Sequence, residues 1–298
     1  MRLDEIQESE NVEDRRGDGG GGFRFPGGGG GLGFGTIALL TVVGWALGIN
    51  PAILIGGAEI ISGGRGGGQV TQRTSAPAPS SPQDEQMRQF VSRVLRTNED
   101  VWKVVLPDQK GVPFRAAPLV LFRGATRSGC GGAESAMGPF YCPVDTRIYL
   151  DMSFFEEMRS KMRAGGDFAY AYVVAHEMGH HIENLLGILP KVQQMQQRVS
   201  RREANALSVR VELMADCLAG VWAHHAQQKW RILEQGDIEE ALTAAAAIGD
   251  DKLQKQAQGY VVPDSFTHGS SEQRTRWLTQ GLRTGDMRQC DTFNARAL

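Results

Sequence analysis

The sequence predicts a mainly helical α+β fold with one small sheet, preceded by a single transmembrane helix. Three observations lead to this prediction. Several segments carry apolar residues at helical spacing, two short segments are typical of strands, and one long apolar run near the N-terminus has no charged side chain. Strands and helices do not alternate regularly and no internal repeat is present, so the class is α+β.

The composition of the 298 residues is that of a globular protein. Hydrophobic residues make up 41% and charged residues 22%, which is enough apolar surface for a core and excludes disorder throughout the chain. The formal net charge is −2, with 32 Lys and Arg against 34 Asp and Glu. The bulk charge therefore gives no reason to expect a nucleic-acid partner.

The N-terminal region divides into three parts by composition. Residues 1–31 are charged and then glycine-rich, so we expect a disordered arm that cannot bury enough apolar surface to fold. Residues 32–56 contain an apolar run long enough to cross a bilayer, and we expect a transmembrane helix rather than a core helix or a signal peptide. Residues 57–83 are rich in Gly, Ser and Pro, which is typical of a flexible linker, and the folded domain is expected over 84–298.

Within this domain, apolar spacing predicts six helices and two strands. The strands are expected at 118–122 and 147–151, before the central helices. The helices are expected at 84–104, 152–163, 167–187, 200–228, 237–248 and 270–283.

The segment HEMGH, from His176 to His180, carries the clearest chemical signal. Its two histidines are four residues apart, so a helix places both imidazoles on one face at a spacing that can share a zinc ion. Glu177 lies off that line and can reach a metal-bound water without ligating the metal. The alternative for so short a motif is a helix with two hydrogen-bonded histidines.

A second pair of side chains at the same spacing strengthens the zinc interpretation. Glu212 and Asp216 lie in an otherwise apolar stretch, where a carboxylate needs a partner such as a metal ion or an ion-paired neighbour. Glu212 as third ligand gives the two-His, one-Glu set of catalytic zinc, and Asp216 can accept the second ring N–H of a ligand histidine. Competing carboxylates lie in more polar windows, namely Asp167, Glu183 and Glu203.

The remaining histidines are weaker candidates. His268 lies in a turn-rich loop just before a predicted helix, where it could donate to an oxyanion or make a structural hydrogen bond. His181 lies on a different face of the motif helix, and we expect it to support the site or face the substrate. His224 and His225 lie further along the helix predicted at 200–228, and we expect surface or packing roles.

All four cysteines follow the apolar run, which suits an oxidising compartment. Cys130 and Cys142 bracket a Gly-rich loop that a short disulfide could close. The other two are Cys217 and Cys290; four cysteines allow three connectivities, and four reduced, buried thiols are the alternative. Three arginines before the run against two after it favour a cytoplasmic N-terminus.

Long strings of the sequence resemble the bacterial family of predicted neutral zinc metallopeptidases, which are single-span membrane proteins. These strings are ESENVEDRRG, TRSGCGGAESAMGPFYCP, VVAHEMGHHIENLLG, VELMADCLAG, GDIEEAL, PDSFTHGSSEQRTRW and DMRQCDTF. The resemblance implies His176 and His180 as zinc ligands and Glu177 as the catalytic carboxylate, and it supports Glu212 as third ligand by similarity to other zincins. It thus implies a zincin-like catalytic domain with a small sheet packed near the motif helix.

These observations together predict a membrane-anchored zinc metallopeptidase with one zinc ion per chain and a peptide or protein substrate. Glu177 would take a proton from the zinc-activated water and pass it to the leaving amine. The strand at 147–151 could offer an edge to the substrate backbone. The expected location is the bacterial inner membrane, with one span in the lipid bilayer and the catalytic domain on the periplasmic side.

Two other functions fit parts of the sequence. One is a membrane-tethered scaffold or binding protein with a structural zinc site, which does not need Glu177 and which usually closes the fourth ligand position with Cys or His. The other is a zinc hydrolase of a non-peptide amide, because the motif specifies the nucleophile and not the substrate.

Overall fold

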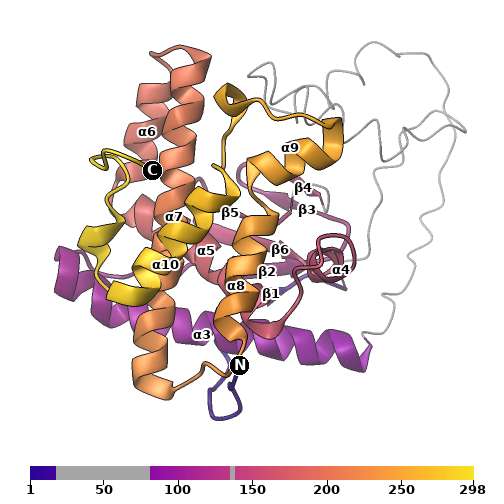
Figure 1. Cartoon of the computed structure of the whole chain (residues 1–298). Helices are drawn as coiled ribbons and strands as arrows, with labels where there is room; N and C mark the ends of the chain where they lie inside the picture. The colour runs from indigo at the N-terminus through magenta and orange to yellow at the C-terminus, as the bar shows by residue number, and fades with distance from the viewer. Residues whose placement is uncertain (18–80, 135–137) are drawn as a thin grey trace, which may run out of the picture.

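The computed structural model describes residues 1–17, 81–134 and 138–298 (Figure 1). This part of the chain is mainly helical with two small sheets, which confirms the predicted α+β class. No helix within these ranges is both long and apolar enough to cross a bilayer. The transmembrane helix predicted at 32–56 and almost all of the linker predicted at 57–83 lie outside the described residues.

The larger sheet has four strands in the order β1-β2-β6-β5. Strands β1 (Val12–Asp14), β2 (Leu119–Phe122) and β6 (Arg147–Asp151) run parallel, and β5 (Phe140–Cys142) runs antiparallel to β6. Leu119 pairs with Ile148 in the register of β2 and β6. The two strands predicted from sequence are therefore the central pair of this sheet.

Both faces of the sheet are covered because its central strands alternate between two apolar sets. Leu119 and Leu121 of β2 belong to the main core, which the helices share. Val120 and Phe122 point to the other face, in a smaller cluster with Ala133. Ala133 comes from the hairpin of β3 (Ala125–Ser128) and β4 (Gly131–Glu134).

The position of β6 corrects one expectation. β6 pairs with β2 on one side and with β5 on the other, so residues 147–151 do not offer an edge to a substrate. Four of its five residues are buried, as expected for a strand covered on both faces. Among the described strands, β5 ends the sheet on this side.

Eight α-helices lie in the described ranges, and two of them were missed from sequence. They are α3 (Pro82–Lys110), α4 (Ser153–Ser160), α5 (Asp167–Leu185), α6 (Ile188–Gln196), α7 (Arg201–Trp230), α8 (Asp237–Ala247), α9 (Asp250–Gln258) and α10 (Ser271–Thr284). The missed helices, α6 and α9, are nine residues each, which is shorter than the window of about 11–18 residues over which an apolar period is recognised.

Two glycines allow the central helices to cross in close contact. A Cβ atom at Gly179 of α5 would lie 3.0 Å from the backbone of Ala215 in α7. A Cβ atom at Gly281 of α10 would lie 1.9 Å from the carbonyl oxygen of Cys217 in α7. Helix α7 is therefore held closely against both α5 and α10, and the site described below lies where these three helices meet (Figure 1).

Residues 1–17 belong to the folded domain, so the disorder predicted for 1–31 is wrong for this part. Strand β1 pairs with β2, and Leu3 is buried in the main core. Ser9 and Asn11 donate to the buried carboxylate of Glu99 in α3 at 3.0 and 2.6 Å. The prediction failed because the composition of a segment does not show the surface that the rest of the domain offers it.

Candidate metal centre

Helix α5 presents the two motif histidines on one face, as their spacing predicts. Residues 168–179 of α5 are all buried, so the helix is a core element with its polar motif at the centre of the domain. The ring centroids of His176 and His180 lie 4.8 Å apart, and the ring planes are close to perpendicular. Both rings reach the same point beside α7.

Glu212 of α7 completes a three-residue cluster. Its carboxylate oxygens lie 3.2 Å from Nε2 of His176 and 3.6 Å from Nε2 of His180. One possible ligand atom of each residue lies within 4.8 Å of the other two. The fold thus brings together the three residues that the sequence suggested as ligands.

This cluster fits a zinc ion of the catalytic type. Two imidazole nitrogens and one carboxylate oxygen are common zinc donors, and a three-residue protein set keeps one position for water or substrate. The Nδ1 atoms of His176 and His180 each face a carboxylate, which leaves both Nε2 atoms directed toward Glu212. No fourth ligand of this kind joins the cluster among the described residues.

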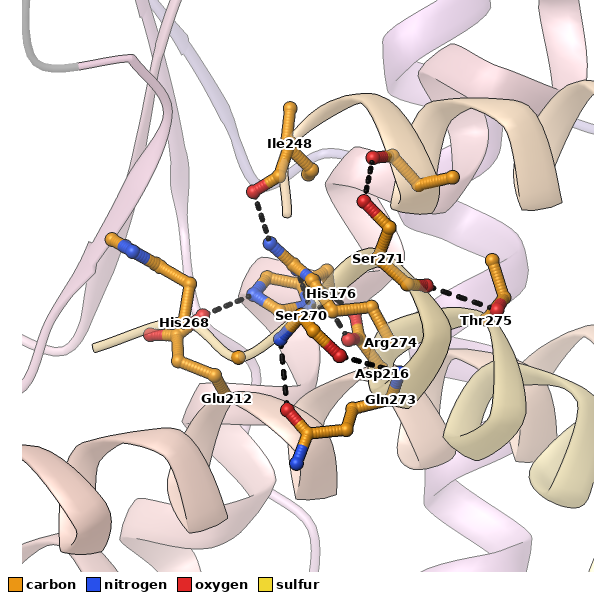
Figure 2. Close-up of polar contacts among 12 residues, drawn as sticks. His176, Glu212, Asp216, Ile248, His268, Ser270, Ser271, Gln273, Arg274 and Thr275 are labelled. Carbon is orange, nitrogen blue, oxygen red and sulfur yellow. Dashed lines mark hydrogen bonds and ion pairs between the residues drawn. The ribbon is translucent and has the colours of Figure 1, made fainter. Parts of the chain in front are cut away.

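Asp216 supports His176 from behind, as the sequence suggested. Its Oδ1 lies 2.9 Å from Nδ1 of His176 (Figure 2). Arg274 of α10 donates from Nε to Oδ2 at 2.9 Å and from Nη2 to Oδ1 at 3.0 Å, and the Tyr172 hydroxyl also donates to Oδ1. Arg274 and Asp216 are almost wholly buried, so this is an internal ion pair.

Sequence reasoning missed Arg274, although the need for it could be inferred. A carboxylate predicted to lie in an apolar helix requires a cation or several donors. Arg274 lies 58 residues away in sequence, in a helix of otherwise polar character. No local spacing rule connects the two positions.

Glu183 plays the corresponding part for His180. Its Oε2 lies 2.8 Å from Nδ1 of His180, one turn earlier on α5. Its other oxygen, Oε1, is buried and has no hydrogen-bond partner among the described residues. The sequence pointed to Glu183 only as a competing ligand, whereas the structure places it against the ring nitrogen that faces away from Glu212.

The charges around the two rings favour a cation. Burial disfavours the charged form of His176, but Asp216 and Glu212 outweigh it and raise the pKa of His176 to about 10. Burial also disfavours ionised Glu212, yet His180, His268 and His176 hold the pKa of Glu212 well below its usual range. The carboxylates thus create a demand for positive charge that a divalent metal ion would meet.

Glu177 lies beside the cluster and is 7% exposed. Its carboxylate makes no hydrogen bond with the part of the chain that the structure describes. Burial raises the pKa of Glu177, and the nearby histidines oppose that rise while Glu212 adds to it. A buried carboxylate with a raised pKa is typical of a general base that acts near neutral pH.

His268 enters the site from the loop before α10, close to Glu212 (Figure 2). Asp250, which sequence reasoning missed, accepts from the backbone N–H of His268 at 2.6 Å and lies 3.2 Å from Nδ1 of its ring. The Asp250 carboxylate also accepts from the backbone N–H groups of Thr267 and Gly269. The structural hydrogen bond that the sequence allowed is therefore present, and the ring stays one-third exposed.

The other histidines lie away from the cluster. His181 is wholly buried, with Nδ1 3.0 Å from the Tyr141 hydroxyl and Nε2 2.7 Å from the Arg115 carbonyl. It therefore joins α5 to β5 and supports the fold. His224 and His225 contact backbone carbonyls at the end of α10, which is the packing role expected for them.

Both pairs of cysteines form disulfides. Cys130 bonds Cys142, as expected for the loop they bracket, and Cys217 bonds Cys290. The second bridge ties α7 directly after Asp216 to the short 3₁₀ helix Met287–Cys290. The alternative of four reduced thiols is wrong.

The chain is similar over most of its length to bacterial proteins without a described function. "Uncharacterized protein YpfJ" of Escherichia coli K12 is 48% identical over 299 residues, which cover 98% of this chain and 99% of the relative. "Uncharacterized protein Rv2575" of Mycobacterium tuberculosis H37Rv is 44% identical over 216 residues, which cover 68% of this chain and 70% of the relative. No solved structure matches the chain.

A family described as "Putative neutral zinc metallopeptidase" matches residues 1–293. The match includes the cluster of His176, His180 and Glu212, and it also includes the N-terminal strand β1. Since it spans nearly the whole sequence, this chain belongs to that family of zinc metallopeptidases.

Proposed function

We propose that this protein is a zinc metallopeptidase that hydrolyses peptide bonds at the centre formed by His176, His180 and Glu212. The observation that carries the proposal is the convergence of these three side chains beside the buried Glu177. Membership of the family supports a protein or peptide substrate. The resemblance to zincins supports the same assignment of ligands.

The two histidines would hold zinc through their Nε2 atoms and Glu212 through a carboxylate oxygen. When bound, zinc polarises the scissile carbonyl and lowers the pKa of a water molecule to about 7. Asp216 and Glu183 accept the Nδ1 protons, so each ring is held in the tautomer that presents Nε2 to a metal.

Glu177 would take a proton from the attacking water and deliver it to the leaving amine. Its burial and raised pKa support this role, because proton transfer is most effective when the pKa lies near the working pH. His268, whose Nδ1 faces Asp250, would donate a hydrogen bond to the developing oxyanion. The backbone of β5 would accept an extended substrate, because β5 ends the described sheet.

We place the catalytic domain outside the bacterial inner membrane. Two disulfides and no free cysteine in the described residues support an oxidising compartment. The uncharged apolar stretch from Phe34 to Ile55 supports attachment to the lipid bilayer.

The experiment compares the full chain with Glu177→Gln for zinc content and for cleavage of casein and a peptide library. We expect about one zinc per chain in both and a loss of roughly 10²- to 10⁴-fold in the rate of the variant. Glu203→Gln is the matched control, because Glu203 is exposed and glutamine also suits its capping position at the start of α7.

Three results would contradict the proposal. Equal cleavage by Glu177→Gln would remove Glu177 from the chemistry, and a folded chain without zinc would remove the metal centre. Zinc with no cleavage by the wild type would favour the scaffold function.

A further inference from the structure

The two ends of the segment 18–80 are held together by one side chain. Arg16 comes just before the segment, and α3 begins just after it. Nη1 of Arg16 donates to the carbonyl oxygen of Asp84 at 2.9 Å, and Nη2 lies 3.2 Å from Oε2 of Glu85. Only 7% of the Arg16 side chain is exposed, so this contact is part of the packed domain.

The residues before the segment are bound into the domain along their whole length. The backbone N–H of Leu119 donates to Asn11, and the N–H of Arg15 donates to Leu121, so β1 is tied to β2 at both ends. Ser9 contributes through the buried Glu99, which accepts from its hydroxyl.

The first residue is fixed as well. The Met1 ammonium lies 3.2 Å from the carboxylate of Glu234 and 3.4 Å from that of Asp237. The N–H of Arg2 donates to the carbonyl oxygen of Ile232 at 2.8 Å. Both contacts join the N-terminus to the region just after α7. This region follows the apolar stretch in the sequence, whereas the N-terminus precedes it.

These contacts conflict with a single crossing of the membrane by the intervening residues. The hydrocarbon core of a bilayer is about 30 Å thick, whereas the hydrogen bonds that join β1 to β2 span about 3 Å. Residues 1–17 and 81–298 must therefore lie on the same side of any membrane. This holds whatever conformation residues 18–80 adopt.

We propose that residues 1–17 and 81–298 lie on one side of the bilayer, so that the chain makes no net crossing between them. The uncharged stretch from Phe34 to Ile55, which supports attachment to the bilayer, then does not separate the N-terminal residues from the rest of the domain across the membrane. This replaces the single-span topology expected from the sequence.

The test is labelling of two single-cysteine variants of the full chain, Gln7→Cys and Gln256→Cys. Both positions are exposed, one in the N-terminal segment and one on α9, and no native thiol is free among the described residues. A membrane-impermeant maleimide is added to right-side-out spheroplasts and to sealed inverted vesicles. Carbonate extraction of the same membranes reports whether the chain is embedded.

We expect both cysteines to react in the same preparation and the chain to stay in the membrane pellet. Reaction of Gln7→Cys and Gln256→Cys from opposite sides would overturn the shared side. Release into the carbonate supernatant would overturn the attachment to the bilayer. Reaction of both only in inverted vesicles would support the one-sided topology while contradicting the external location given under the proposed function, so the two can fail separately.

Discussion

The two motif histidines of α5, His176 and His180, are supported by carboxylates of very different character. Asp216 accepts from His176, Tyr172 and Arg274, so both of its oxygens are used. Glu183 accepts from His180 through one oxygen, and the other is buried without a partner in the described structure. Burial raises the pKa of Glu183 to about 7 although His180 opposes the rise, whereas the pKa of Asp216 is lowered because Arg274 and His176 outweigh burial.

This difference shows that two histidines related by one helical turn need not be supported equally. Asp216 joins three helices, because Tyr172 and His176 lie on α5 and Arg274 lies on α10. Glu183 lies on the same helix as the ring it supports. Disturbing Asp216 should therefore affect the fold and the metal together, and disturbing Glu183 should affect mainly one ring.

Removing Glu212, which lies near both His176 and His180, should have the largest effect on zinc binding. We expect Glu212→Ala to lower zinc affinity by more than the roughly 10- to 100-fold cost of losing a supporting carboxylate. The reason is that Glu212 lies within 3.6 Å of both rings and is the third donor of the set. Competition titration with a chelating dye measures the affinity, with Glu239→Ala on the exposed side of α8 as control. Full zinc occupancy in Glu212→Ala would show that another residue is the third ligand.

Asp216, whose two oxygens both accept hydrogen bonds, should tolerate an isosteric change to the amide less well than Glu183. In Asp216→Asn the new amide must face Arg274 or another donor, and the buried guanidinium loses its counter-charge. We expect the free energy of unfolding to fall by about 3–5 kcal/mol and zinc affinity to fall by roughly 10- to 100-fold. Urea unfolding in the presence of a chelator separates the first effect from the second. A stability close to wild type would mean that the ion pair contributes little.

Asp250 supports His268 and its loop but contacts neither His176 nor His180, so changing it tests the support of His268 alone. We expect Asp250→Asn to lower the free energy of unfolding by about 1–3 kcal/mol, because several backbone N–H groups lose a charged acceptor, and to leave zinc affinity unchanged. Burial would raise the pKa of Asp250, but His268 and the backbone donors outweigh it and lower the pKa below 3.8.

The stability that Asp250 contributes should therefore be present above about pH 3.8 and be lost as the pH falls through its lower folded-state value. Urea unfolding of the metal-free wild type and of Asp250→Asn between pH 3 and 7 measures this. The difference in the free energy of unfolding between wild type and Asp250→Asn should become smaller as the pH approaches 3. A difference that stays constant over this range would contradict the assignment.

Glu183, which uses only one of its two oxygens, should tolerate replacement by the amide best. In Glu183→Gln the amide oxygen can still accept from His180, and the NH₂ group takes the place of Oε1, which faces no described donor. We expect the free energy of unfolding to change by less than about 1 kcal/mol and zinc affinity by less than roughly tenfold, below the usual range for such residues. Losses of stability and zinc affinity equal to those of Asp216→Asn would show that Asp216 and Glu183 support their histidines equally.

Much of the site could be predicted because its key residues lie in pairs close together in the sequence. A four-residue spacing on a helix places two side chains on one face whatever surrounds it, and both pairs, His176 with His180 and Glu212 with Asp216, follow this rule. The partners of these residues do not follow it. Arg274 and Asp250 reach the site from separate elements, and Glu183 was undervalued because its neighbours in sequence are polar.

The fold shows the same division. Strands β2 and β6 and the long helices were found from their apolar periods, whereas β1 was missed because residues 12–14 gain their partners only from β2. The sequence by itself determined the α+β class, the motif helices and the identity of the candidate metal-binding side chains, since these depend on local periodicity and on residue chemistry. Only the tertiary structure decided which charges pair inside the core and that the N-terminus shares a sheet with the rest of the domain. Those features depend on contacts between residues far apart in the chain, and no local pattern encodes them.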